Sequence, residues 1–153
     1  MDKGAVGDKG MGHKRTKKRE NSFSFERDIR RIASDNLFYR RVVYTGPHSQ
    51  LVLMSIPPGG ETGEEKQKDT DEMLFIVKGK AKSILNKRAR DATKYEVIFV
   101  PAGNLHNLKS SGRHDVKIFA VYSPPLYADG TVHKTPEDSL AARTMQFAYA
   151  GEQ

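Results

Sequence analysis

The sequence predicts an all-β fold, and three observations support this prediction. Short segments rich in aromatic and β-branched residues follow one another at even spacing after residue 38. Gly and Pro residues separate these segments, as expected for a β-sandwich or barrel. With 153 residues, the chain has the length of one domain. It contains no cysteine, so disulfides and thiolate metal sites are excluded.

The first 22 residues form a basic segment that we expect to be a disordered tail. Residues 1–20 carry seven Lys or Arg residues and three acids, and so supply +4 of the formal net charge of +7. The basic run 13–19 is typical of a nuclear address or a nucleic-acid patch, and also of a solubilising tail. No apolar run approaches the ~20 residues of a membrane span, and no signal-peptide core is recognised, so we expect a cytoplasmic protein.

Residues 23–153 are predicted to form one domain that begins with a short helix. Phe25, Ile29, Ile32 and Ala33 recur at helical spacing, which predicts a helix over residues 25–36 with Ser24 as its N-cap. Strands are then expected at 38–45, 50–56, 72–77, 81–85, 95–100, 105–109 and 116–122, with a charged hairpin at 86–94. The barrel therefore spans residues 38–123.

The C-terminal segment 124–153 is expected to be irregular at first and helical later. Pro136 at a first helical position, Thr135 before it and acidic residues after it predict a helix over residues 136–148. The strands at 73–77 and 118–122 are apolar on both faces. Since one face fills the barrel, the other needs a cover, and we expect a homodimer to supply it.

Candidate functional residues lie on two segments. Glu65 and Gln67 are two residues apart and so share a face if the chain is extended there. Glu72 follows on the next strand, and His106 follows the turn at residues 101–103. We expect these four side chains to meet inside a small barrel.

The spacing of these residues resembles the two motifs of the cupin superfamily. The first motif is Gly-x5-His-x-His-x3–4-Glu-x6-Gly, and the matching positions are Gly59, Glu65, Gln67, Glu72 and Gly79. The second is Gly-x5-Pro-x-Gly-x2-His-x3-Asn, of which Pro101, Gly103 and His106 are retained. The opening Gly is replaced by Tyr95 and the closing Asn by Ser110. The likeness covers residues 38–123 and implies a double-stranded β-helix, or jelly roll. It is strongest to small single-domain cupins of the conserved-barrel type, a subgroup sometimes likened to mannose-6-phosphate isomerase.

The resemblance implies that Glu65, Gln67, Glu72 and His106 hold one divalent metal. This chain offers one imidazole where the family has two or three, and carboxylate and amide oxygens suit Mn or Fe better than structural zinc. The candidates are Mn, Fe, Ni or Zn, and a site without metal stays open. Two carboxylates buried together without a cation would be costly, which argues for a metal if both point inward.

Three functions stay open, and the sequence does not decide whether the protein is an enzyme. It is a protein that binds a small polar molecule in the barrel, or a metal-dependent enzyme of the sugar isomerase or epimerase type, with Glu65 or Glu72 as catalytic base. The third possibility is a non-catalytic interaction module whose basic tail binds acidic partners. His48, His114 and His133 are expected at the surface, and for His133 a place in a lid over the barrel is the alternative.

Overall fold

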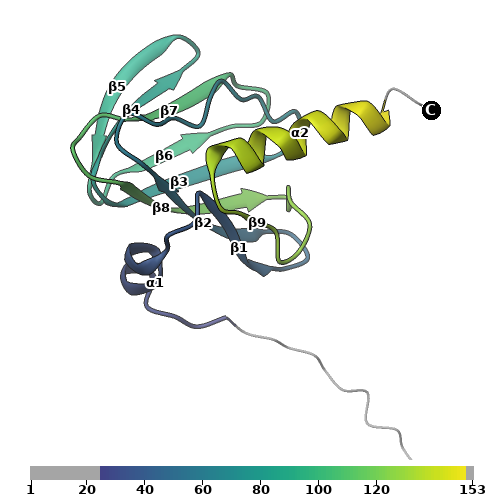
Figure 1. Cartoon of the computed structure of the whole chain (residues 1–153), viewed down its shortest axis with the longest axis horizontal. Coiled ribbons are helices and arrows are strands. Elements are labelled where there is room, and N and C mark those ends of the chain that lie inside the picture. Colours follow the sequence, from purple (N-terminus) through teal and green to yellow (C-terminus); the bar gives the residue numbers. More distant parts are fainter. Residues whose placement is uncertain (1–24, 151–153) are drawn as a thin grey trace, which may run out of the picture.

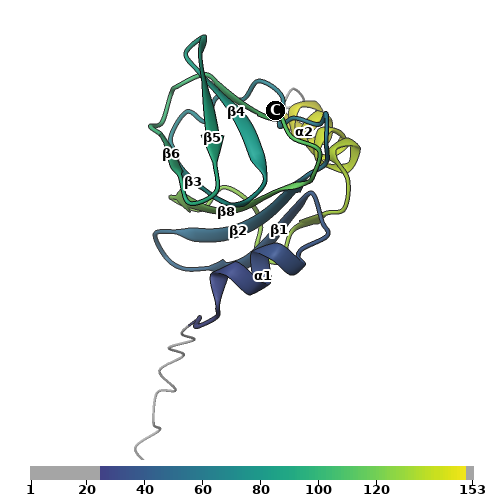
Figure 2. The same ribbon diagram turned by 90° about the vertical axis from the view of Figure 1, so that its left-hand side faces the viewer.

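The strands form two antiparallel sheets that face one another (Figures 1 and 2). The computed structural model describes residues 25–150. The larger sheet has the order β6-β3-β8-β2-β1-β9 and the smaller one the order β5-β4-β7. The strand bounds are β1 Arg40–Thr45, β2 Gln50–Ile56, β3 Asp71–Lys78, β4 Lys80–Leu85, β5 Arg88–Thr93, β6 Val97–Val100, β7 His106–Ser110, β8 Val116–Ser123 and β9 Val132–His133. The predicted all-β class is confirmed, and the architecture is that of a double-stranded β-helix.

The core lies between the two sheets and follows from the alternation of side chains along each strand. In β3, Leu74 and Ile76 are buried, and their partners across β8 are Ala120 and Ile118, which are also buried. The smaller sheet adds Leu108 from β7 to the same cluster. The same alternation places Arg40 of β1 and Glu72 of β3 in the interior, although both side chains are charged.

The two glycines of the first motif occupy backbone conformations that favour glycine. Gly79 links β3 to β4 with φ +91°, and a Cβ atom there would lie 2.6 Å from the carbonyl oxygen of Asp115. Gly59 has φ +76° in the turn after β2. Tyr95 also has positive φ, +73°, at the position where the second motif has glycine. The predicted strand 95–100 is therefore too long, since β6 begins at Val97.

Helix α1 (Ile29–Asp35) is shorter than predicted and has a different cap. Asp28, not Ser24, is the N-cap, and its carboxylate accepts hydrogen bonds from the backbone N–H groups of Arg30 and Arg31 at 3.0 and 3.4 Å. Phe25 lies before the helix, with its ring 5.7 Å from that of Tyr44. Its helical spacing was therefore misleading. The helix packs outside β2 and β8, and the predicted basic tail of residues 1–22 lies outside the described residues.

Helix α2 (Pro136–Ala150) begins where the sequence predicts and lies beside the barrel, next to β9 and away from α1 (Figure 1, yellow). The hydroxyl of Thr135 accepts a hydrogen bond from the N–H of Asp138, and the Asp138 carboxylate accepts one from the N–H of Thr135. Neither helix in residues 25–150 has both the length and the apolar character needed to cross a membrane.

Two regular segments were not predicted as strands of their own. Strand β9 pairs with β1 through Arg40 and His133, in a segment expected to be irregular. A two-residue strand carries no periodicity, so only the distant partner defines it. Strand β5 occupies most of the charged hairpin, after a turn in which Asn86 and Lys87 have φ +47° and +67°.

Candidate functional site

Three of the four predicted site residues come together in the barrel interior. Glu65 and His106 form an isolated antiparallel bridge, in which each backbone N–H donates to the other residue's carbonyl, at 2.8 and 2.9 Å. Glu72 lies on the inward face of β3, opposite Tyr122 of β8. The backbone therefore fixes all three positions independently of any bound group.

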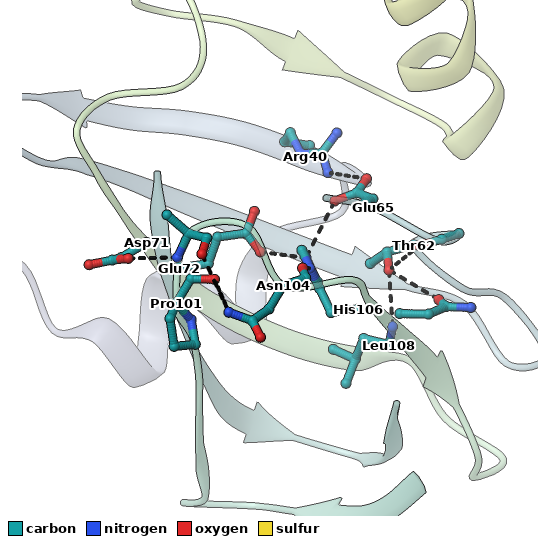
Figure 3. Close-up of polar contacts among 12 residues, drawn as sticks. Arg40, Thr62, Glu65, Asp71, Glu72, Pro101, Asn104, His106 and Leu108 are labelled. Atoms are coloured by element: carbon teal, nitrogen blue, oxygen red, sulfur yellow. Dashed lines mark hydrogen bonds and ion pairs between the residues drawn. The ribbon is translucent and has the colours of Figure 1, made fainter. Parts of the chain in front are cut away.

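The side chains of Glu65, Glu72 and His106 converge and are buried (Figure 3). The Nε2 atom of His106 lies 2.6 Å from Oε2 of Glu72 and 3.9 Å from Oε2 of Glu65. One ligand atom from each residue falls within 4.8 Å of the others. The arrangement has the donor atoms and the closeness of a site for one cation.

The ring of His106 is oriented by its second nitrogen. Nδ1 lies 3.1 Å from the carbonyl oxygen of Asn104, an acceptor that favours a proton on Nδ1 and directs Nε2 toward the carboxylates. Burial lowers the pKa of His106, but the hydrogen bond to Glu72, the charge of Glu72 and the Asn104 carbonyl outweigh it, so the pKa is raised. Glu72 thus stabilises a positive charge at the position of His106.

One carboxylate oxygen of this group has no partner among the described residues. Oε1 of Glu72 is buried and accepts no hydrogen bond there, and Glu72 itself is 1% exposed. A buried carboxylate oxygen without a donor is costly, and a cation between the two carboxylates would compensate both. The residues present therefore fit a divalent metal ion.

Two arginines that the sequence analysis missed complete the site. Arg40 of β1 is 1% exposed, and its Nη2 atom lies 3.7 Å from Oε1 of Glu65. Arg143 of α2 contacts the same Glu65 oxygen. The alternation of side chains along a strand could have indicated Arg40. However, each face of the strand receives one Arg and one Val from the sequence Arg40-Arg41-Val42-Val43. The arginine that points inward could therefore not be identified.

Two cavities adjoin this group, and they differ greatly in size. The inner cavity has a volume of ≈ 10 Å³, and the residues that line it include all three converging side chains. The outer cavity has a volume of ≈ 760 Å³ and lies between the barrel, the segment after β8 and α2. Arg40 and Glu65 line both cavities and so form the boundary between them.

The remaining predicted residues lie on the outer side of this boundary. Gln67 lines the outer cavity, and its backbone carbonyl accepts a hydrogen bond from the N–H of Gly103 at 2.7 Å. Its role as a metal ligand stays a prediction. His133 also lines the outer cavity, as in the lid alternative, whereas His48 and His114 are exposed, as expected.

Comparisons with known proteins agree with this architecture. A family model described as "Cupin domain" matches residues 52–122. The uncharacterized protein YrkC of Bacillus subtilis is 35% identical over 122 residues, which cover 75% of this chain and 65% of that protein. The chain thus spans slightly less than two thirds of that relative's length.

Two further proteins are similar to this chain. Uncharacterized protein L612 of Acanthamoeba polyphaga mimivirus is 34% identical over 109 residues, covering 69% of this chain and 68% of that protein. The crystal structure of BH2720 from Bacillus halodurans matches with a TM-score of 0.76 and 29% identity, covering 80% of this chain and 97% of that one. From the motifs, the fold and these matches, the chain belongs to the cupin superfamily.

Proposed function

We propose that the protein binds one divalent metal ion through Glu65, Glu72 and His106, and that the site serves to hold a small polar molecule in the outer cavity. The observation that carries this proposal is the inner cavity. It is about the size of a single water molecule, and its lining includes two buried carboxylates and one imidazole. No organic ligand fits such a volume, whereas an ion does.

The donor set favours an oxygen-preferring ion. Two carboxylates and one imidazole suit Mn²⁺ or Fe²⁺ better than a structural zinc site, and Ni²⁺ and Zn²⁺ are the competing candidates. Gln67 lines the outer cavity and not the inner one, so it would act as the proposed fourth ligand only after its amide oxygen turns inward. A bound ion would supply Lewis acidity to a molecule that reaches it from the outer cavity.

A metal-dependent isomerase or epimerase is the second candidate, and one observation favours it. Of the two converging carboxylates, Glu65 lines both cavities, whereas Glu72 lines the inner one. Glu65 is therefore placed to take a proton from a molecule in the outer cavity, and Glu72 to hold the imidazole of His106. Turnover of a substrate in the outer cavity would distinguish this candidate from binding alone.

Metal analysis of the purified protein tests the proposal. We expect close to one Mn, Fe, Ni or Zn per chain by mass spectrometry, and saturable Mn²⁺ binding followed by electron paramagnetic resonance. Glu72→Gln and His106→Gln should each weaken Mn²⁺ binding at least tenfold, because each removes one of three ligands. Asp91→Asn is the control, since it also removes one carboxylate, from an exposed pair with Lys82.

Two results would contradict the proposed metal site. If the wild type takes up no metal under these conditions while Gln67→His does, the natural site lacks a ligand and the proposal is wrong. If Glu72→Gln and Asp91→Asn bind Mn²⁺ as the wild type does, the metal is bound elsewhere.

A further inference from the structure

We infer that the outer cavity takes a small oxyanion, a molecule with a carboxylate or phosphate group, and that Arg40 receives this group. The inference extends the proposed function by naming the chemical class of the ligand. It depends on three features of the described residues: the donors of Arg40 that make no hydrogen bond, the charges around the cavity, and the cavity's size.

Arg40 has the properties of a built anion receptor. It is 1% exposed, and its guanidinium carbon lies 5.2 and 4.7 Å from the ring centroids of Tyr39 and Tyr127. Its Nη1 atom donates to the hydroxyl of Ser139 at 2.5 Å, which fixes the orientation of the group. Burial and these contacts leave the guanidinium little freedom, so binding an anion costs little further ordering.

The other edge of the guanidinium makes no hydrogen bond among the described residues, although its Nη2 atom is ion-paired with Glu65. The Nε and Nη2 atoms of Arg40 are buried and make no hydrogen bond among the described residues. The Glu65 oxygen at 3.7 Å from Nη2 is too far for one. Nε and Nη2 present two roughly parallel N–H groups, the geometry that binds carboxylate and phosphate through two hydrogen bonds. Both atoms are buried, so an oxyanion in the outer cavity would reach this edge after neighbouring side chains move. Buried donors without acceptors are costly, and relieving that cost favours binding of an oxyanion there.

The charge balance points to the same class of ligand. Around the inner site, the two carboxylates of Glu65 and Glu72 are matched by the two guanidinium groups of Arg40 and Arg143. A divalent ion added to this balanced set leaves two excess positive charges in a buried position. A dianion in the outer cavity would neutralise them, while the charges of Lys66 and Glu64 on the same wall offset one another.

The size and lining of the cavity restrict the ligand further. A volume of ≈ 760 Å³ lies within the ~300–1,000 Å³ range of small-molecule sites. Leu126, Tyr127, Ala128 and Ala142 supply an apolar part of the wall. The site therefore suits a compact molecule with a short organic body and an anionic group, and it does not suit a polymer.

Calorimetric titration with defined probes tests the inference. Inorganic phosphate and malonate represent the two oxyanions, and glycerol represents a neutral polyol. Each is titrated into Mn²⁺-loaded and EDTA-treated protein. We expect at least one anion to bind the wild type at least tenfold more tightly than glycerol. The stronger of the two anions then identifies phosphate or carboxylate as the natural group.

The variants separate Arg40 from general charge effects. Arg40→Gln should reduce anion affinity at least tenfold, and Arg40→Lys should restore part of it, since it keeps the charge but loses the two-pronged geometry. Arg90→Gln is the matched control, because Arg90 is exposed and pairs with Glu96 on the surface. If Arg40→Gln does not fold, Arg40→Lys serves instead and should weaken anion binding about threefold to tenfold, because lysine lacks the two parallel N–H groups.

Two results would overturn the inference: glycerol binding as tightly as the anions, or equal anion affinity in Arg40→Gln and Arg90→Gln. The outcome is separable from that of the proposed function, because Mn²⁺ binding is measured independently. Mn²⁺ uptake without anion binding refutes only the anion site. Arg40-dependent anion binding by EDTA-treated protein that takes up no Mn²⁺ supports the anion site and refutes the metal.

Discussion

The Nε2 atom of His106 lies 2.6 Å from Oε2 of Glu72, in an interior position where both residues are at least 94% shielded from solvent. The imidazole approaches the carboxylate from β7 and the carboxylate approaches from β3, so the contact joins the two sheets of the barrel. A change in this pair would therefore affect both the candidate site and the contact between the two sheets.

The first prediction concerns the pH dependence of this pair in metal-free protein. Burial lowers the pKa of His106, and the hydrogen bond and charge of Glu72 raise it by more. Glu72→Gln should therefore move the pKa of His106 below its usual range, since burial then dominates. Nuclear magnetic resonance titration of the imidazole signals measures this directly, and an unchanged pKa would contradict the assigned cause.

The same shift predicts how stability depends on pH. The folded protein holds the His106 proton more tightly than the unfolded chain, whose His titrates near pH 6.5. The stabilisation is therefore fully present below about pH 6.5 and is lost as the pH rises through the higher folded pKa. Urea unfolding across this window should show a decline in wild-type metal-free protein that is absent in Glu72→Gln.

The second prediction is that Arg143→Gln strengthens metal binding. Arg143 contacts Oε1 of Glu65, so its charge compensates the carboxylate that we propose as a ligand. Removing a competing positive charge should raise Mn²⁺ affinity by roughly tenfold, about 1.4 kcal/mol. Electron paramagnetic resonance titration provides the measurement, with Arg90→Gln as the control. A weaker affinity for Mn²⁺ in Arg143→Gln would show that α2 supports the site and does not compete with it.

The third prediction is that Tyr95→Gly stabilises the protein. Tyr95 has φ +73°, a left-handed conformation that costs an L-residue about 1–2 kcal/mol, and its side chain is 73% exposed. Glycine avoids this cost but loses more entropy on folding, so the net gain should be about 0.5–1 kcal/mol. Tyr95→Ala is the control, because it retains the Cβ atom and should give no gain. Thermal unfolding of the three proteins compares them.

The fourth prediction is a homodimer formed through the outer face of the larger sheet. Phe75 and Phe119 are cross-strand neighbours on that face, with ring centroids 5.9 Å apart. Val97 and Phe99 of the adjacent β6 are 53% and 50% exposed. Such a contiguous apolar surface is typical of an interface, and a second copy of the chain presents the same surface.

Light scattering after size exclusion measures this directly. The wild type should have the mass of two chains, and Phe99→Asp should have the mass of one. Ala89→Asp, on the exposed strand β5, is the control and should stay dimeric. A wild type with the mass of one chain would refute the interface.

The barrel itself could be predicted from the sequence because its signals are local. Strand β2 has the predicted bounds, since an apolar run ends at a Pro-Pro-Gly-Gly turn. Glu72 and His106 could be identified because motif spacing fixes their places on β3 and β7, which belong to the two facing sheets. The N-cap of α1 was predicted wrongly as Ser24, because the sequence also contains a second acceptor, Asp28, directly before Ile29.

The arginines and the outer cavity could not be predicted because they arise from contacts between distant segments. Arg40 is bonded to Ser139, 99 residues away, and Arg143 reaches Glu65 from a helix whose packing no local pattern specifies. The two-residue strand β9 is set by its pairing with β1. For each of these, the sequence shows the residue type, but the partner becomes evident only in three dimensions.

The boundary between the two cavities has a kinetic consequence for the proposed metal site. Arg40 and Glu65 stand at the boundary, and α2 holds both of them, through Ser139 and Arg143. If the site holds the proposed ion, the ion can enter or leave only when these side chains part, so its exchange with the medium should be slow even where affinity is modest. Chelators would then remove the metal ion only over hours. The ion found after purification would be the one that was available while the chain was folding.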